Sequence, residues 1–366
     1  MKVAYDHQIF CRQPYGGISR YFTSLAEDMA AQNVDARIFA PWHINRYLAD
    51  QPQNWIHGRF VPTYPKGLRS LAKVYNTLEV NRQLNSWAPD IVHETFYSWQ
   101  PSINRHTTVT TVYDMISELF PESFKNPGKM TYKKRKALDR ADHIICISEN
   151  TRTDLLNLFP IAEDKVSVVH LGCDTPSLSE HESFDVLPSD APYIIYVGLR
   201  GGYKNCEALL RAVAASTHLK NDFNILCFGG GDFSTEEQRM IAALGFREGQ
   251  VKQTSGSDQW LHHCMRHAST FVFPSLYEGF GMPPLEAMAS DCPVVCSNVS
   301  SMPEVVGDAA EYFDPTSTED LARAIEHLVY NPEVAAKLVL LGRQRLSHFT
   351  WDKCAKQTKQ VYTKLI

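Results

Sequence analysis

The order of apolar and polar residues predicts that short strands and amphipathic helices alternate along the chain. Apolar, β-rich runs are expected to form strands, and segments with apolar residues every three or four positions are expected to form helices. In the first half we expect strands at Lys2–Tyr5, Asp35–Ala40, Ile91–His93, Thr107–Tyr113, His143–Ser148 and Val166–His170, and helices near 19–32, 68–87, 129–140 and 150–159. This alternation is typical of a parallel sheet, because neighbouring parallel strands need long crossover connections.

The alternation stops at residues 174–192 and then restarts. That segment is rich in Pro, Ser, Glu and Asp with little periodicity, which predicts an interdomain linker. Further strands are expected at Tyr193–Val197, Asn224–Phe228, Val251–Gln253, Thr270–Phe273, Val294–Cys296 and Glu311–Phe313, with helices between them and an amphipathic helix at Asp352–Leu365. The predicted fold is α/β, with Rossmann-like domains at 1–173 and 193–348, facing a central cleft, and a closing helix in 349–366 that returns to the first domain.

Length and composition agree with a soluble two-domain protein. The chain has 366 residues, of which 44% are hydrophobic, so it is too long for one typical core. Its net charge of -5 argues against a nucleic-acid partner. No apolar run reaches the roughly 18 residues of a membrane span, which predicts a cytoplasmic or peripheral protein. Nine scattered cysteines indicate free thiols in a reducing compartment.

No spacing of cysteines and histidines predicts a metal site. Cys292 and Cys296 lack a matching second pair. His263 and His267 stand one helical turn apart, but they lack an acidic or cysteine partner at the usual spacing, so we interpret them as part of a structural helix face.

The segment 273–286, FPSLYEGFGMPPLE, carries the most specific chemical signal. It places Glu278 in a glycine turn after an expected strand and Glu286 in the first turn of an expected helix. Gly279 and Gly281 permit backbone conformations closed to other residues. Two prolines suit the first helical turn, where the amide of Leu285 is free to face an anion. Carboxylates at this position are suited to binding sugar or ribose hydroxyls.

Other glycine turns also follow expected strands. Gly16 and Gly17 open the first helix and can bring backbone close to a phosphate, although the G-x-G-x-x-G fingerprint of dinucleotide sites is absent. In the second domain, Arg200 and Lys204 flank a turn and are suited to a pyrophosphate. Gly229 and Gly230 form a third turn, against which a flat base can lie.

Polar residues end two strands of the first domain. His93 and Glu94 follow one expected strand, and Tyr113 and Asp114 follow the next. Each pair is either part of a ligand site or a satisfied strand-end group, and the sequence leaves both readings open.

These motifs together resemble the retaining glycosyltransferases of family 4, which have two Rossmann-like domains (the type B architecture). The resemblance covers nearly the whole chain. It is carried by Glu278 and Glu286 in their segment, the Arg200 and Lys204 turn, Gly16 and Gly17, the run 301–309 (SMPEVVGDA), and the closing segment from Phe349.

The resemblance implies roles for individual positions. Glu278, Arg200 and Lys204 would be the catalytic residues: Glu278 would hold the hydroxyls of the donor sugar, and the two cations would bind its diphosphate. The remaining contacts to the nucleotide sugar would come from Gly16, Gly17, Tyr113, Asp114, Gly229, Gly230, Gly279, Phe280, Gly281, Leu285 and Glu286. His93 and Glu94 would contact the acceptor. Tyr113 departs from the family pattern, which has histidine in many members.

The expected reaction is the transfer of a hexosyl unit from GDP-mannose or a UDP-hexose to a saccharide or lipid-linked saccharide. This would serve the assembly of a bacterial surface polysaccharide. The nucleotide sugar is then a substrate, and no cofactor is expected. The chain has no Asp-x-Asp triplet, which agrees with a metal-independent enzyme in which positive side chains neutralise the leaving group. The resemblance implies retention of anomeric configuration by front-face attack.

The densest basic stretch, Lys129–Arg140, has two interpretations. It is either a solvated helix face or a peripheral contact with anionic lipid, to which each cation adds roughly 1 kcal/mol.

Other functions stay open at this point. A nucleotide-sugar epimerase has the same architecture but needs no acceptor. A non-catalytic sensor of nucleotide sugars is also possible, and a Glu278→Ala variant that keeps its biological activity would favour it. An NAD-dependent enzyme ranks last, because neither half has the dinucleotide fingerprint.

Overall fold

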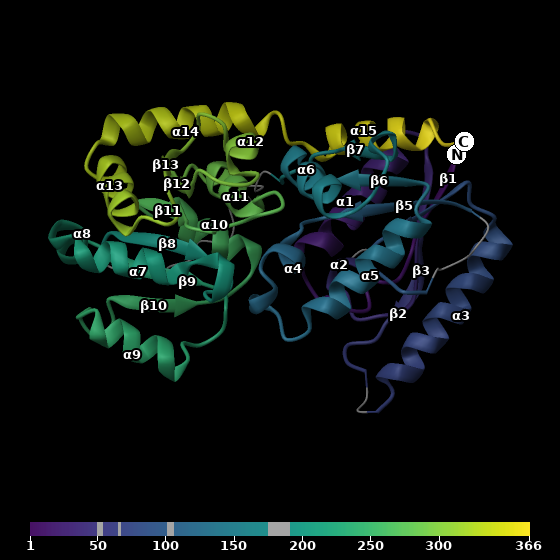
Figure 1. Ribbon diagram of the computed structural model, residues 1–366, viewed down its shortest axis with the longest axis horizontal. Coiled ribbons are helices and arrows are strands. Elements are labelled where there is room, and N and C mark those ends of the chain that lie inside the picture. The colour runs from purple at the N-terminus through teal and green to yellow at the C-terminus, as the bar shows by residue number, and fades with distance from the viewer. Residues whose placement is uncertain (50–53, 65–66, 101–105, 175–190) are drawn as a thin grey trace. The chain divides into compact units, whose positions relative to one another are not determined.

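The computed structural model describes residues 1–49, 54–64, 67–100, 106–174 and 191–366, and these form two compact units (Figure 1). The N-terminal unit comprises Met1–Gly172 and Phe349–Ile366, and the C-terminal unit comprises Cys173–His348. The linker predicted at 174–192 lies almost wholly outside the described residues. Each unit is a parallel α/β domain, as the sequence predicts.

The N-terminal unit is built on a sheet that has seven strands within the described residues, in the order β3-β2-β1-β4-β5-β6-β7. Its strands are β1 (Lys2–Tyr5), β2 (Asp35–His43), β3 (Ile56–Phe60), β4 (Ile91–Glu94), β5 (Thr107–Val112), β6 (His143–Cys146) and β7 (Val166–Val168). All neighbouring pairs are parallel. The sequence did not predict β3, because this edge strand has His57, Gly58 and Arg59 at its centre, no continuous apolar run and no fully buried residue.

Helices connect these strands and cover the sheet. They are α1 (Gly17–Ala31), α2 (Arg46–Ala49), α3 (Arg69–Trp87), α4 (Ile116–Leu119), η1 (Pro121–Ser123), α5 (Pro127–Arg140), α6 (Glu149–Leu158), η2 (Glu163–Lys165) and α15 (Trp351–Thr363). The first helix, α1, buries one apolar face that includes Phe22, Leu25 and Met29. Such burial is the main source of stability in an amphipathic helix.

The last helix, α15, is fixed to the N-terminal unit by a buried polar contact. Tyr362 and His93 are both fully buried, and 2.5 Å separates the Tyr362 hydroxyl from His93 Nδ1. The other ring nitrogen of His93 lies 2.8 Å from Thr111 Oγ1. On the outer side, Lys359 donates to the carbonyl of Gln32, which follows α1. Both nitrogens of His93 thus have partners inside the core, and burial lowers its pKa to about 3.

The C-terminal unit has a sheet with six strands among the described residues, in the order β10-β9-β8-β11-β12-β13. The strands are β8 (Tyr193–Val197), β9 (Asn224–Phe228), β10 (Val251–Thr254), β11 (Thr270–Phe273), β12 (Val294–Ser297) and β13 (Glu311–Phe313). The helices are η3 (Gly202–Lys204), α7 (Cys206–Ala215), α8 (Thr217–Asp222), α9 (Thr235–Ala243), α10 (Asp258–Arg266), α11 (Met282–Ala289), α12 (Met302–Val306), α13 (Thr318–Val329) and α14 (Pro332–Leu346). Figure 1 shows α7 and α13 in this unit, and both contribute to its apolar core.

The strand order of the C-terminal sheet determines where a site can form. From β8, the chain adds β9 and β10 on one side, and then crosses to add β11, β12 and β13 on the other. Loops on the two sides of such a reversal diverge at the carboxyl ends of the strands and leave a crevice, which is where open α/β sheets bind ligands. The reversal lies between β8 and β11, and the segments 198–205 and 274–281 follow these two strands.

We expect Tyr362→Phe to destabilise the N-terminal unit by about 1 to 3 kcal/mol, because it leaves a buried ring nitrogen of His93 without its partner. Urea denaturation measures the loss. The matched control is Thr363→Val, whose side chain is exposed and which should change stability by less than about 0.5 kcal/mol. Equal stability of Tyr362→Phe and wild type would contradict the role given to this contact.

Candidate functional site

The candidate site lies at the carboxyl ends of β8, β9, β11 and β12 in the C-terminal unit. It includes the predicted residues Arg200, Lys204 and Glu278. The first two follow β8, and the third follows β11, the neighbouring strand. Residues that are far apart in the sequence therefore meet at the crevice between these strands.

An ion pair joins the two loops at their centre. Lys204 Nζ lies 2.7 Å from Glu278 Oε1, and the two side chains are only 18% and 10% exposed. The ammonium group also lies 5.3 Å from the ring centroid of Tyr203 and 5.5 Å from that of Phe273. Because lysine has three donors and a carboxylate has about four acceptor positions, both groups keep capacity for a ligand.

Two serines after β12 fix the backbone around Glu278. The amide of Glu278 donates to Ser300 Oγ at 3.0 Å. Ser301 Oγ donates to the carbonyls of Glu278 and Phe280, both at 3.0 Å. Ser300 adopts a φ of 53°, a left-handed conformation that costs energy for a residue other than glycine. The sequence did not indicate Ser300, since nothing in its local pattern shows that it contacts a loop 22 residues away.

The turn that follows Glu278 is closely packed. Gly281 caps α11 with a φ of 95°, and a β-carbon there would lie 2.2 Å from the Met302 side chain. Prolines occupy the first turn of α11, as the sequence predicted. Leu285 is fully buried, and Gly279 and Phe280 are buried as well. Glu286 is partly buried on the same helix, eight residues after Glu278.

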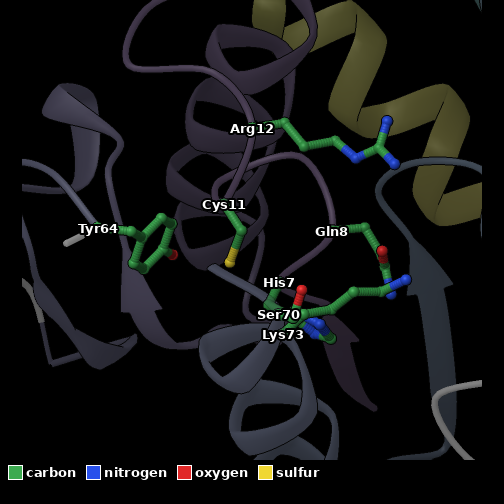
Figure 2. Close-up of a pocket in the computed structure, with 7 residues that line it drawn as sticks. All are labelled: His7, Gln8, Cys11, Arg12, Tyr64, Ser70 and Lys73. Carbon is green, nitrogen blue, oxygen red and sulfur yellow. The ribbon is translucent and has the colours of Figure 1, made fainter. Parts of the chain in front are cut away.

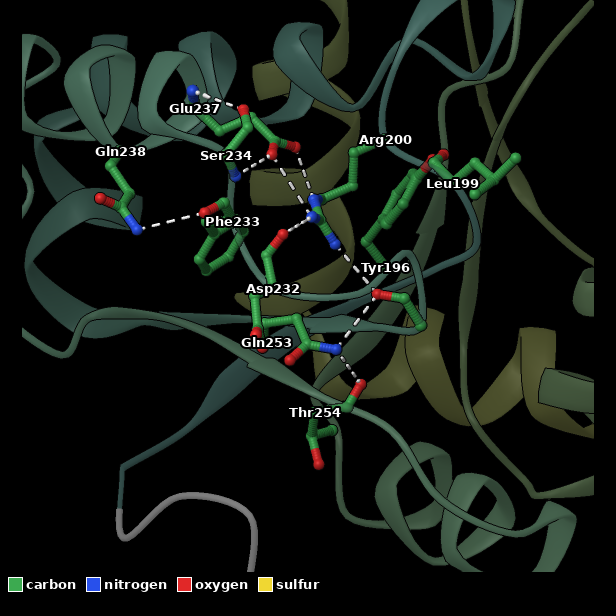
Figure 3. A network of polar contacts seen from close by, with 11 residues as sticks. Tyr196, Leu199, Arg200, Asp232, Phe233, Ser234, Glu237, Gln238, Gln253 and Thr254 are labelled. Atoms are coloured by element: carbon green, nitrogen blue, oxygen red, sulfur yellow. Dashed lines mark hydrogen bonds and ion pairs between the residues drawn. The ribbon is translucent and has the colours of Figure 1, made fainter.

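Arg200 is bound to the glycine turn after β9 (Figure 3). Its Nε donates to Glu237 Oε1 at 2.6 Å, and its Nη1 donates to the carbonyl of Gly229 at 2.9 Å. Its Nη2 donates to the carbonyl of Asp232 at 3.0 Å, and the guanidinium lies 4.7 Å from the ring centroid of Phe233. The side chain is 6% exposed. Arg200 thus connects its own loop to the turn after β9 and to α9, and these three hydrogen bonds all go to groups of the protein.

Glu237, which the sequence did not indicate as a site residue, holds Arg200 in place and also caps α9. Its carboxylate accepts from the amide of Ser234 at 2.7 Å, and its amide donates to Ser234 Oγ, which forms a capping box. The hydrogen bond from Arg200 lowers the pKa of Glu237, so the pair stays ionised at neutral pH. The S-x-x-E spacing at 234–237 is a signal for the cap, but not for the partner of the carboxylate.

The glycine turn leaves space for Arg200. Gly229, Gly230 and Gly231 all have a positive φ, of 84°, 73° and 72°. A β-carbon at Gly230 would lie 2.6 Å from Arg200 Nη1 and 3.0 Å from the Gly198 carbonyl oxygen, whereas one at Gly231 would meet nothing within 4 Å. Gly230 is therefore required by close approach as well as by backbone conformation.

In the N-terminal unit, Gly16 and Gly17 lie at the start of α1, as predicted. Gly16 is the N-cap residue, and a β-carbon there would lie 2.6 Å from the Gln13 side chain. Gly17 has open space where a β-carbon would be. Ser19 donates its amide to Gln13 Oε1 at 3.3 Å.

His93 and Glu94 follow the predicted strand but are buried. His93 belongs to the core contact with Tyr362 described above. Glu94 is 2% exposed and forms a two-pronged ion pair with Arg140, at 2.7 and 2.5 Å. Burial raises the pKa of the Glu94 carboxyl to about 7, against the opposing effect of Arg140. In this structure both residues have partners within the unit, so their predicted contact with an acceptor has no support from the geometry.

Tyr113 and Asp114 follow β5. The Tyr113 hydroxyl donates to the carbonyl of Thr95 at 2.8 Å, and its ring is 6% exposed. Asp114 is partly buried, and its Oδ1 accepts from the amide of Ile116 at 3.0 Å. The tyrosine thus has a satisfied hydroxyl inside the unit, while Asp114 has a partly accessible carboxylate.

The basic helix α5 is less basic on its surface than its sequence indicates. Lys134 is 1% exposed and donates to Glu118 Oε2 at 2.5 Å. Arg140 turns inward to Glu94. Lys129, Arg135 and Lys136 are exposed. Of the six cations in this stretch, Lys134 and Arg140 therefore form ion pairs inside the unit and do not add to its surface charge.

Among the residues that the structure describes, no three or more His, Cys, Asp or Glu side chains are grouped so that they could hold a metal ion. None of the described helices combines the length and the hydrophobicity of a membrane span. All nine cysteines are free thiols, and each except Cys11 is buried.

Comparison with known proteins gives the same family for both units. The family model "Glycosyltransferase Family 4" matches residues 15–176, and the model "Glycosyl transferases group 1" matches residues 179–345. The O-antigen chain mannosyltransferase B of Escherichia coli is 27% identical over 375 residues, which cover 96% of this chain and 97% of that protein.

Solved structures share the architecture. Sucrose-phosphate synthase from Thermosynechococcus elongatus matches with a TM-score of 0.77 and 20% identity, over 100% of this chain and 98% of that one. Anabaena HepE in complex with UDP and glucose matches with a TM-score of 0.73 and 17% identity, over 99% of each chain. At these identities the matches show the fold alone, which is that of two-domain type B glycosyltransferases.

We expect Gly230→Ala to weaken the C-terminal unit more than Gly231→Ala does. Both substitutions place alanine at a positive φ, which costs roughly 1 to 2 kcal/mol. Only Gly230→Ala also pushes a methyl group into Arg200 and the backbone of Gly198. Urea denaturation of the two variants isolates this second effect. Equal losses would show that the turn does not depend on the position of Arg200.

Proposed function

Since the chain belongs to the group 1, family 4 glycosyltransferases, we propose that it transfers a hexosyl unit from a nucleotide-diphosphate sugar with retention of anomeric configuration. The donor is GDP-mannose or a UDP-hexose, and the acceptor is a saccharide or a lipid-linked saccharide. The observation that supports this proposal best is the Lys204 and Glu278 pair at the crevice between β8 and β11.

The two members of the pair suit the two halves of a donor. Lys204 provides a positive charge in a partly buried place, where its attraction to a diphosphate is less screened than in water. Glu278 provides carboxylate oxygens for sugar hydroxyls, and Glu286 accepts hydrogen bonds from the ribose. Arg200 acts mainly by fixing the Gly229 and Gly230 turn against which the base lies.

The proposed reaction is a front-face displacement. The bond between the anomeric carbon and the diphosphate oxygen breaks, and the acceptor hydroxyl forms a new bond to that carbon from the same face. The leaving diphosphate takes the proton of the hydroxyl, so no protein base is needed. Lys204 stabilises the negative charge that develops on the diphosphate. Glu278 orients the sugar and does not form a covalent intermediate.

The names of relatives support a hexose donor and a polysaccharide product. The full-length relative in Escherichia coli is an O-antigen chain mannosyltransferase, which favours GDP-mannose. The Anabaena neighbour binds UDP and glucose, which keeps a UDP-hexose as the second choice. We place the protein in the assembly of a bacterial surface polysaccharide on this basis. Neutralisation by lysine and helix termini would make the reaction independent of a divalent metal.

Glu278→Gln and Lys204→Gln should each lower kcat/KM by about 100-fold or more, because each removes a charge that acts on the reacting donor. Initial rates of sugar transfer from GDP-mannose and UDP-glucose measure kcat/KM for the variants and the wild type. Glu236→Gln and Lys252→Gln are matched controls, since both side chains are exposed in the same unit. Full activity in Glu278→Gln would contradict the proposed role, and activity without an acceptor would favour an epimerase.

Peripheral contact with anionic lipid through α5 is a further part of the proposal. It rests on the exposed Lys129, Arg135 and Lys136. Flotation with vesicles containing phosphatidylglycerol should show binding that is lost at high salt and in Arg135→Gln/Lys136→Gln. Absence of binding at low salt would rule this contact out.

A further inference from the structure

A cavity lies in the N-terminal unit, and none of the residues that line it was given a role above (Figure 2). Its volume is about 410 Å³. Its lining residues are His7, Gln8, Cys11, Arg12, Tyr64, Ser70 and Lys73. Four of them come from the segment after β1, Tyr64 follows β3, and Ser70 and Lys73 belong to the first turns of α3. The cavity is therefore open at the carboxyl ends of parallel strands, where α/β folds bind ligands.

His7 provides an unused hydrogen-bonding atom in the wall of the cavity. Its side chain is 3% exposed, and its Nδ1 is buried with no hydrogen-bond partner among the described residues. Burial lowers the pKa of His7; Asp6 opposes this shift and Lys73 adds to it. The ring is therefore neutral at pH 7. Buried polar atoms in folded proteins nearly always have a partner, so an unpaired one in a cavity wall indicates a ligand.

Positive charge gathers around this cavity. Arg12 and Lys73 line it, and both lie over aromatic rings, Arg12 at 4.8 Å from the Phe96 centroid and Lys73 at 5.9 Å from that of Trp99. The pKa of the neighbouring Lys133 is lowered by burial and then by the charges of Arg12, Lys73 and Lys129. Arg12, Lys73 and Lys129 are thus each close enough to Lys133 to repel its charge.

Two other groups near the cavity are already occupied. Asp6 is 1% exposed, and its carboxylate accepts from Thr95 Oγ1 at 2.6 Å and from the Thr95 amide at 2.9 Å. The Cys11 thiol donates to the carbonyl of Trp42, and burial raises its pKa to about 12, so it is not a nucleophile. The chemistry that the cavity offers is therefore cationic and hydrogen-bonding.

We propose that this cavity binds a phosphate or diphosphate group carried by the acceptor. Arg12 and Lys73 would neutralise its charge, and His7 Nδ1, Gln8 and Ser70 would bond its oxygens. Arginine offers a fork of donors and lysine a point charge, the pairing that phosphate sites commonly use. This inference rests on the proposed function, since it gives the acceptor a charged group that the transferase holds during reaction.

Two sources share this chemistry, a lipid diphosphate that carries a saccharide and a soluble sugar phosphate. The surface of α3 favours the lipid. Leu71, Val74 and Leu78 are 63%, 57% and 65% exposed, and they lie on one face of the helix that also carries Lys73. Exposed apolar side chains in such a row are suited to acyl or polyprenyl chains.

Binding of inorganic pyrophosphate tests the site. We would titrate it by calorimetry into the full chain carrying Lys204→Gln, which removes a cation of the donor site. We expect Lys73→Gln to weaken binding about tenfold, as loss of one charged hydrogen bond does, and Arg12→Gln to do the same. Lys125→Gln, with an exposed lysine outside the cavity, should have no effect. No binding, or binding that Lys73→Gln leaves unchanged, would overturn the proposal.

Two further probes separate the sources. One is phosphatidylcholine vesicles that contain a polyprenyl diphosphate, and the other is soluble mannose 1-phosphate. Binding to the vesicles that is lost when either Lys73 or Leu78 is substituted supports the lipid source. Binding of mannose 1-phosphate without any binding to the vesicles supports the soluble source. Binding of neither probe overturns the proposal.

These titrations need no turnover, so they are independent of the proposed activity. If the protein transfers sugar but does not bind the anion at Lys73, the proposed phosphate site is refuted and the proposed activity stands. If the protein binds the anion at Lys73 but transfers no sugar, the proposed activity is refuted and the anion site stands.

Discussion

The ion pair between Lys204 and Glu278 is the contact on which the candidate site depends. It joins the two loops that border the crevice between β8 and β11. Because both charges are mostly buried, each would be costly without the other, so the pair holds the two loops together. Ser300 and Ser301 fix the backbone of the Glu278 loop from the side of β12. The site is thus formed by the fold, and a donor would meet charges that are already in position.

Arg200 acts next to this pair in a different way. Its guanidinium is held by Glu237 and by two carbonyls, of Gly229 and Asp232, so it stabilises the turn after β9. A cation used in this manner shapes the surface that a base or a phosphate would contact. Lys204 and Arg200 thus differ in their partners. Lys204 is paired with Glu278 in the crevice, whereas Arg200 is held by the Glu237 carboxylate and by two backbone carbonyls.

The sequence predicted the strands of both sheets well, since buried parallel strands such as β8 and β11 are short, continuous apolar runs. It also predicted the family and the two-domain fold, which the comparisons confirm. It missed β3, an edge strand with His57, Gly58 and Arg59 at its centre and no fully buried residue. It could not show that Lys204 meets Glu278, or that Glu237 holds Arg200, because these contacts depend on strand order. Likewise, only the packing of α15 and α5 reveals that His93, Glu94, Lys134 and Arg140 face inward.

Thermal unfolding of the purified chain with UDP, GDP, dTDP, ADP or CMP, with and without EDTA, tests whether the protein binds a nucleoside diphosphate at this crevice. A ligand at 100 times its dissociation constant adds roughly 2.7 kcal/mol of stability. We expect that one nucleoside diphosphate stabilises the protein selectively, that EDTA does not change this effect, and that Lys204→Gln reduces it. Stabilisation by none of these nucleotides, together with a response to NAD, would contradict a nucleotide-sugar site at the crevice between β8 and β11.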